Sequence, residues 1–308
     1  MMTNAHGFSA ALLALCAACA STPSAHGVES ERGEAALHGQ VASTLNSARL
    51  EEHAHDHDSD DDHDHEPREP LGFQIGKGWL DPWLHRHASP NGTPLVHPFL
   101  TEPAFLGRDV FLTYTAEDRA SALEAEIEWA LTRRLGLVVE GAYEDNEVSG
   151  GFGDTFVALR ALLVEQERYL ISVSGEARLP TGSARKETGT GESGWAAIAH
   201  GWFDLGGWYT LQGTAGYEAI PSLDESAFIW SATFAKSFAV SPLFEGRRDP
   251  HGFVPALSLL AEVAGEDDEG LWLAGVSYSI AGDLDVRAAF SRSFEGENSW
   301  TIGVIWHF

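Results

Sequence analysis

From Arg108 to Phe308 the chain consists of short runs, each about ten residues long, in which apolar and polar side chains alternate. Clusters of Gly, Asp, Asn and Pro separate these runs. An alternation with a period of two is that of a β-strand with two unlike faces. The expected strands are 108–117, 121–131, 135–144, 154–164, 168–179, 195–204, 207–218, 227–238, 253–264, 270–280, 283–293 and 298–308. An even number, about twelve, suits a closed antiparallel barrel with both ends on one side of a membrane.

The connections between the expected strands alternate in length. Short turns follow every second strand, and longer polar segments such as 180–194 lie between them, as in barrels with short periplasmic turns and long outer loops. The connection 239–252 is an exception, because it is long where a short turn is expected, so a strand could be missing there.

The last run ends on an aromatic residue. Trp300, Ile302, Val304, Trp306 and Phe308 share one face, and Thr301, Gly303, Ile305 and His307 share the other. This pattern resembles the signal that the bacterial barrel-assembly machinery reads, with Trp306 and Phe308 as its key residues. We therefore expect that machinery as a partner and the bacterial outer membrane as the location.

The two faces of the runs favour different surroundings. The apolar face suits outer-membrane lipid, where a charge at the midplane costs about 2–4 kcal/mol. The polar face is expected to line a lumen with Glu124, Glu126, Glu128, Glu140, Glu176, Glu262, Asp285, Arg160, Arg178 and Arg287. A carboxylate-rich lining favours cations. Alternatively, the arginines bridge carboxylates and narrow the lumen, which is the preferred interpretation.

Tyr and Trp residues also fall near both ends of the expected strands. Trp129, Tyr169, Tyr209, Tyr278 and Trp306 lie near one end, and Tyr143, Trp195, Tyr217, Trp230, Trp272 and Trp300 near the other. Amphipathic rings prefer the headgroup level, so the sequence predicts two aromatic belts.

The N-terminus has the pattern of an export signal. An apolar stretch from Phe8 to Ala20 ends in Ala18-Cys19-Ala20, which is typical of a signal peptide over residues 1–20. A lipidated Cys19 is the alternative. The chain has two cysteines, Cys16 and Cys19, so cleavage would leave no disulfide.

Residues 21–70 are polar, and their composition predicts disorder. Within them an acidic stretch, here called the histidine arm, carries His53, His55, His57, His63 and His65. Imidazoles beside carboxylates suit Zn, Cu or Ni, and a solvated acidic linker is the competing interpretation. No cofactor is expected to be required. Residues 71–107 form an irregular connector or plug.

Charge and motifs exclude several function classes. With 46 acidic and 19 basic residues, the net charge is -27, which argues against nucleic acid as a partner. His200 with Asp204 or Asp285 is the strongest candidate for acid–base work, but no serine or second histidine lies at a recognisable offset. We therefore expect no enzyme.

Several stretches resemble a known family. They are Glu126–Leu137, Glu140–Tyr143, Gly151–Thr155 and Leu179–Gly182. Together they resemble the bacterial outer-membrane "transporter" family described as putative phenol-degradation meta-pathway proteins, over about residues 105–308. The resemblance implies a barrel that transports small molecules, with aromatic compounds as one candidate class, and it carries no catalytic residues.

The combined prediction is an all-β chain whose closed transmembrane barrel, residues 108–308, passes or binds small solutes or cations. A divalent-metal link through the histidine arm is a further expectation. The alternative is a soluble or lipid-anchored periplasmic metal-binding β-protein. The solute and the oligomeric state are not readable from the sequence.

Overall fold

The computed structural model describes residues 69–308 except 242, 244–255 and 268. The expected signal peptide and the histidine arm lie outside the described residues. The strands are β1 (Arg108–Ala116), β2 (Ser121–Ala130), β3 (Leu135–Asp145), β4 (Gly150–Phe152), β5 (Thr155–Glu165), β6 (Tyr169–Leu179), β7 (Gly194–Gly206), β8 (Tyr209–Ile220), β9 (Glu225–Ala239), β10 (Ala256–Glu266), β11 (Glu269–Ala281), β12 (Leu284–Ser293) and β13 (Asn298–His307). A single-turn 3₁₀ helix, η1, spans Ala184–Lys186. Over these ranges, no helix has the length and apolar character needed to cross a bilayer.

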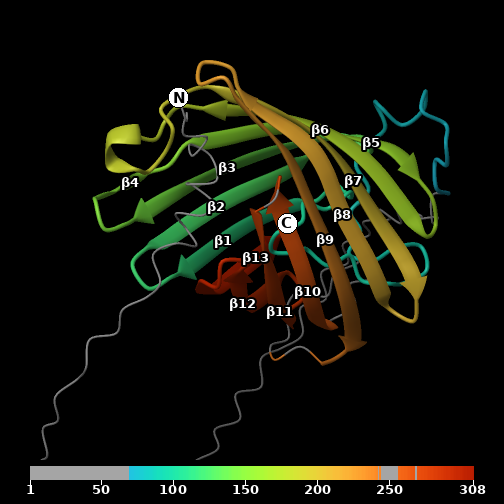
Figure 1. The fold of residues 1–308 in the computed structure, drawn as a ribbon. Coiled ribbons are helices and arrows are strands. Elements are labelled where there is room, and N and C mark those ends of the chain that lie inside the picture. The colour runs from blue at the N-terminus through green and yellow to red at the C-terminus, as the bar shows by residue number, and fades with distance from the viewer. Residues whose placement is uncertain (1–68, 242, 244–255, 268) are drawn as a thin grey trace, which may run out of the picture. The chain divides into compact units, whose positions relative to one another are not determined.

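The strands close on themselves (Figure 1). Each long strand pairs antiparallel with the next, and β1 pairs with β13, with Asp109 opposite His307. The three-residue β4 continues the edge of β5 by pairing with the end of β3. The predicted closed antiparallel barrel of twelve strands is therefore confirmed. The sequence analysis missed β4 because Gly150 and Gly151 leave no alternation to detect.

β9 and β10 are direct neighbours in the barrel. These two strands pair directly along their whole length, from Ala239 opposite Ala256 to Ile229 opposite Glu266. A strand inserted between them would break this ladder. The suggestion that a strand is missing at 239–252 is therefore wrong.

The outer surface of the barrel is apolar. Large side chains point outward along every part of the ring, among them Leu123, Ile127, Leu159, Phe234, Leu259 and Ile302. Such a continuous exposed apolar surface is unfavourable in water, but it matches the acyl chains of a bilayer. Together with closure, which pairs each of the twelve long strands on both sides, it places the protein in the bacterial outer membrane and argues against the soluble alternative.

Aromatic residues lie at both ends of this apolar surface. Trp129, Tyr209 and Trp306 are exposed at the end where the chain enters and leaves the barrel, here called the terminal end. Tyr143, Trp195, Tyr217, Trp272 and Trp300 are exposed at the opposite loop end. Lys236 also faces outward, where its ammonium donates to the carbonyl of Gly207 and lies 4.3 Å from the Tyr209 ring centroid. These positions agree with the predicted aromatic belts.

One loop at the loop end is held by a single carboxylate. Asp154, at the start of β5, accepts hydrogen bonds from the backbone N–H of Gly182 and of Thr190, each at 2.9 Å. A Cβ at Gly189 would lie 2.7 Å from the same carboxylate, so a glycine is needed there. Two of the stretches quoted for the family resemblance, around Asp154 and Gly182, therefore meet in space.

Residues 69–107 form no strand, and their later part, from Leu95 to Leu106, packs against the inward faces of the barrel strands. We call residues 93–107 the plug segment, because their side chains are buried within the barrel. Phe105 and Ala104 pack with Leu162, Leu170 and Trp202 on the inner wall. On the other side of the lumen, Phe99 packs against Leu271, Leu273 and Ala289.

Candidate functional site

The plug segment is fixed to β10 by one glutamate. The two carboxylate oxygens of Glu262 accept hydrogen bonds from the backbone N–H of Phe99, at 2.8 Å, and of Leu100, at 2.9 Å. Thr233 on β9 donates to the same carboxylate at 3.1 Å. A backbone without regular structure leaves polar groups to be satisfied, and here the barrel wall supplies the acceptor.

Two arginines bind the plug segment from other strands. Arg160 on β5 pairs with Glu128 on β2 at 2.9 Å and with Glu102 of the plug segment. Arg287 on β12 donates to the carbonyl of Pro98 at 3.0 Å, and its guanidinium lies 4.7 Å from the Phe99 ring centroid. The carboxylates and arginines of the lumen therefore cross-link the plug segment to the barrel wall.

The first residues of the plug segment are also bound to the barrel wall by hydrogen bonds. The hydroxyl of Thr93 donates to Asp204 on β7 at 2.9 Å, and the side-chain amide of Gln212 on β8 donates to the carbonyl of Val96 at 2.8 Å. Both wall residues are buried. Counting Glu262 and the two arginines, contacts reach the plug segment from strands on several sides of the lumen.

The chain before the plug segment is anchored at the turn between β2 and β3. The guanidinium of Arg134 is fully buried and donates to the carbonyls of Gln74, Lys77, Leu162 and Leu163. Burial lowers the pKa of Arg134, and Glu165 opposes that shift. An arginine stays protonated under physiological conditions, so this charge-assisted anchor persists.

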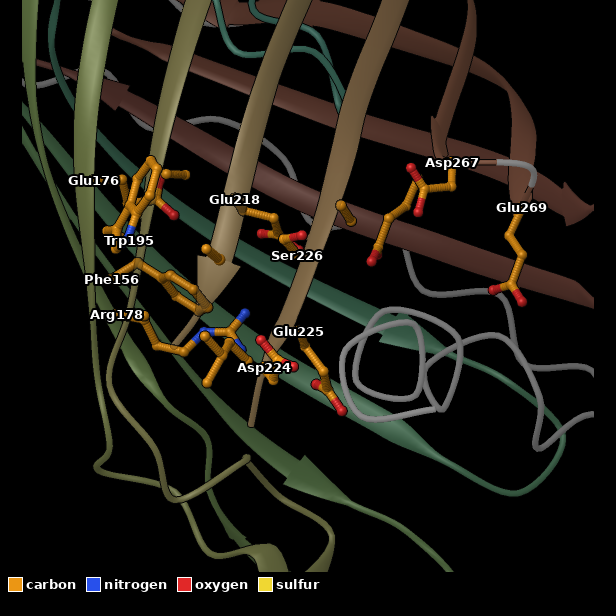
Figure 2. A pocket seen from close by; sticks show the side chains of 16 residues that line it. Phe156, Glu176, Arg178, Trp195, Glu218, Asp224, Glu225, Ser226, Asp267 and Glu269 are labelled. Carbon is orange, nitrogen blue, oxygen red and sulfur yellow. The ribbon is translucent and has the colours of Figure 1, made fainter. Parts of the chain in front are cut away.

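The loop-end half of the lumen is different, because it contains a cavity of about 310 Å³. The carboxylates that line it come from β6, β8, β9, β10, β11 and the connecting loops: Glu176, Glu218, Asp224, Glu225, Glu266, Asp267 and Glu269. We call this cavity the acidic vestibule. Its lining has one cationic side chain, Arg178, whose guanidinium lies 5.0 Å from the ring centroid of Phe156. Figure 2 shows these carboxylates around the cavity wall.

All ten residues predicted to line the lumen lie on inward faces, but they serve different parts of it. Glu176 and Arg178 line the acidic vestibule. Glu128, Glu262, Arg160 and Arg287 bind the plug segment or its partners. Glu124, Glu126 and Glu140 lie on the acidic inner faces of β2 and β3, and Asp285 lies 3.6 Å from His307.

Some of the remaining predicted residues are placed by the structure, and the others lie outside the described residues. Trp306 and Phe308, the expected assembly signal, face outward at the terminal end with ring centroids 5.5 Å apart. The five histidines of the histidine arm lie outside the described residues. His200 contacts Ser174 at 2.8 Å, whereas Asp204 binds Thr93 and Asp285 lies beside His307. The pairings that would suggest acid–base work are therefore not formed among the described residues.

Two groups in the described part of the chain have ligand atoms close enough for one metal ion. Glu102, Glu126 and Glu128 form one group, but Arg160 already pairs with two of its members, Glu102 and Glu128. His97, Asp109 and His307 form the other, which is buried. The alternation of the last strand placed His307 on an inward face, but it gave no sign of the group, since only the β1–β13 pairing brings Asp109 beside His307.

Other functional residues were also missed. Glu102 and Thr93, which bind the wall, gave no signal because the segment 71–107 has no periodicity to orient its side chains. Glu225 and Asp267 of the acidic vestibule lie at strand ends, in the acidic connections. A count of acidic residues in the outer loops would have found Glu225 and Asp267.

No family model matches the sequence, and no curated protein matches it either. Among solved structures, a KdgM porin in complex with disordered oligogalacturonate is similar over 65% of this chain and 99% of its own, with 8% identity and a TM-score of 0.47. A NanC porin is similar over 65% of this chain and 99% of its own, with 9% identity and a TM-score of 0.45. The COG4313 outer membrane channel from Pseudomonas putida F1 covers 69% of this chain and 100% of its own, with 14% identity and a TM-score of 0.43.

These neighbours are outer-membrane β-barrel channels. No comparison supports the phenol-degradation family that the sequence resembles, so that resemblance stays a prediction.

Proposed function

We propose that this chain is an outer-membrane channel for small cationic solutes, which collect in the acidic vestibule and pass when the plug segment shifts. The observation that carries this proposal is the cavity of about 310 Å³ with seven carboxylates and one arginine in its lining. The size suits a small solute. The described geometry suggests passage or binding, and the unformed pairings around His200 give no support to catalysis.

The charge of the acidic vestibule supplies the selectivity. Carboxylates on low-dielectric walls focus a negative potential, which raises the local concentration of cations and excludes anions. One guanidinium cannot neutralise seven carboxylates, so the net potential stays negative. The carboxylates come from several strands and from the loops between them, which gives a cation several possible positions rather than one tight site (Figure 2).

The plug segment explains how such a barrel avoids a permanent leak. It blocks the terminal half of the lumen through specific hydrogen bonds and ion pairs rather than a large apolar core. Polar contacts of this kind can be exchanged for water when the segment moves. We therefore expect a low conductance that rises when these contacts are removed.

The test is single-channel conductance of the refolded chain in a planar bilayer, with the reversal potential measured across a KCl gradient. A permeability ratio that favours K⁺ is expected. Changing Glu218, Glu225 and Glu266 together to Gln is expected to reduce that ratio several-fold. Glu167→Gln is the matched control, because Glu167 is exposed in the β5–β6 turn at the terminal end.

A chain that conducts without any preference for K⁺, or whose preference survives the triple substitution, contradicts the proposal. A chain that never conducts, even when the plug contacts are removed, contradicts it as well.

Two further expectations remain proposals. The outward Trp306 and Phe308 at the end of β13 support recognition by the barrel-assembly machinery, and Phe308→Ala should slow assembly in cells. Metal capture by the histidine arm lies outside the described residues. A peptide of residues 50–67 that binds Zn(II) or Cu(II) no better than a histidine-free control would exclude it.

A further inference from the structure

A group of histidines lies at the terminal end, where the first and last strands close the barrel. Asp109 on β1 and His307 on β13 are register partners, and His97 reaches them from the plug segment. The carboxylate of Asp109 lies 2.6 Å from Nδ1 of His307 through one oxygen and 3.3 Å from Nε2 of His97 through the other. Three chain segments far apart in the sequence thus bring three potential metal ligands together.

The burial of this group is unusual for polar residues. His97, Asp109 and His307 are 7%, 4% and 8% exposed, and Nδ1 of His97 has no hydrogen-bond partner. The backbone also makes room for the carboxylate, because a Cβ at Gly107 would overlap Oδ2 of Asp109. Buried imidazole nitrogens without a partner are costly, so this arrangement suggests a ligand.

Two more imidazoles lie beside the group. The ring of His87 is 5.2 Å from that of His307, centroid to centroid, and its Nε2 lies 2.5 Å from Nε2 of His85. All five side chains line one small cavity of about 20 Å³. Two imidazole nitrogens at that distance need a proton, or another cation, to offset the repulsion of their lone pairs.

We propose that His97, Asp109 and His307 bind one divalent transition-metal ion. The ligand atoms of these three residues lie within 4.8 Å of one another. A tetrahedral Zn(II) site with bonds of about 2.0–2.2 Å spaces its ligands about 3.4 Å apart, so small side-chain rotations suffice. Imidazoles with a carboxylate favour Zn(II), Ni(II) or Cu(II) over the oxygen-binding Mg²⁺ and Ca²⁺.

The surrounding charges fit a divalent ion. Asp109 contributes one negative charge and Asp285 a second, 3.6 Å from Nε2 of His307, where it would orient that ring as an outer ligand partner. The cavity also contains Arg86 and Arg108. Arg86 pairs with Glu165 at 2.8 Å, and the guanidinium of Arg108 lies 4.8 Å from the Trp83 ring centroid, so both have other partners.

Such an ion would fasten the plug segment to both strands of the barrel seam. Binding to the folded chain alone stabilises it by mass action, and the effect grows with metal concentration. This site is independent of the acidic vestibule, which lies at the opposite end of the strands, and of the proposed ion selectivity.

The test uses the full-length chain with His53, His55, His57, His63 and His65 changed to Ala, so that the histidine arm cannot bind metal. After chelator treatment, Zn(II) is titrated against a chromophoric chelator in detergent. We expect one Zn(II) per chain. His97→Ala and His307→Ala should each weaken binding at least about 100-fold, and Asp285→Asn by about 10–100-fold. His200→Ala, a buried lumen histidine outside the group, should bind like the parent.

Folding of each variant is checked by heat-modifiable gel mobility. Zn(II) should raise the temperature of that transition in the parent and in His200→Ala, but not in His97→Ala or His307→Ala. If His307→Ala does not refold, His97→Ala on the plug segment tests the site, with Co(II) absorption bands of a tetrahedral nitrogen–oxygen site as the readout. The proposal is wrong if the parent binds no stoichiometric Zn(II), or if His97→Ala binds Zn(II) as tightly and with the same Co(II) spectrum.

Discussion

The two halves of the lumen use the same residue types for different purposes. Where the plug segment fills the lumen, Glu262, Arg160 and Asp204 each bind a group of that segment. In the loop-end half, Glu176, Glu218 and Glu266 face the acidic vestibule. The inward alternation of the strands is the same in both halves, and the plug segment alone makes the difference. A carboxylate on an inner barrel wall is therefore a structural anchor or a solute contact according to what lies opposite it.

Glu262 and Glu266 show this within one strand. Both lie on the inner face of β10, four residues apart. Glu262 is 4% exposed and accepts two backbone hydrogen bonds, whereas Glu266 borders the acidic vestibule. Substitutions at such positions should therefore affect stability more where the plug segment is bound than in the acidic vestibule.

The largest effect is expected for Arg160→Met, which leaves Glu128 and Glu102 without their cation. Breaking a buried ion pair by removing one partner costs about 3–5 kcal/mol. Urea unfolding in detergent should show this loss, and bilayer recordings should show a higher conductance. Arg178→Met is the control in the acidic vestibule, where water can solvate the carboxylates, so its loss of stability should be smaller. Equal losses would show that the two halves do not differ.

Glu262→Ala removes the acceptor of two backbone N–H groups of the plug segment. Buried donors left without a partner cost about 1–3 kcal/mol each, so we expect a loss of about 2–3 kcal/mol after partial relaxation. Conductance should increase as well. Glu266→Ala should change stability by less than about 0.5 kcal/mol, as do most substitutions away from anchoring contacts. A similar loss for both would remove the distinction drawn along β10.

Thr93→Val tests one hydrogen bond between the start of the plug segment and the barrel wall. It removes one hydrogen bond to the buried carboxylate of Asp204, with an expected loss of about 1–2 kcal/mol. Thr115→Val, in the hydroxyl pair of Thr115 and Thr301 toward the loop end, is the control. Its expected loss is about 0.5–1 kcal/mol. The comparison fails if the control is the more destabilised variant in urea.

The smallest effect on stability is expected for the triple change of Glu218, Glu225 and Glu266 to Gln. These carboxylates repel one another across the acidic vestibule, so neutralising them should leave the free energy of unfolding unchanged or slightly higher, by up to about 1 kcal/mol. The ion selectivity of the same variant should fall. A clear destabilisation in urea would show that these residues anchor structure, as their counterparts in the terminal half do.

The sequence by itself determined the barrel, because a lipid-facing wall requires alternation at every strand. The expected β6, at 168–179, differs by one residue from the observed Tyr169–Leu179, and the expected final strand from Asn298 begins at the observed residue. The same alternation placed Glu126, Arg160 and His307 on inner faces before any pairing was known. These are local properties, with a physical period that the chain must keep.

Only the tertiary structure decided how the inner faces are used. The plug segment has no period, so nothing in residues 71–107 indicates that Phe99 meets Glu262 or that Glu102 meets Arg160. The group of His97, Asp109 and His307 depends on closure of the barrel. Closure pairs β1 with β13, which are the first and last strands along the chain. Contacts between residues so distant in the chain are set by the three-dimensional packing of the plug against the wall, and local sequence patterns carry no information about that packing.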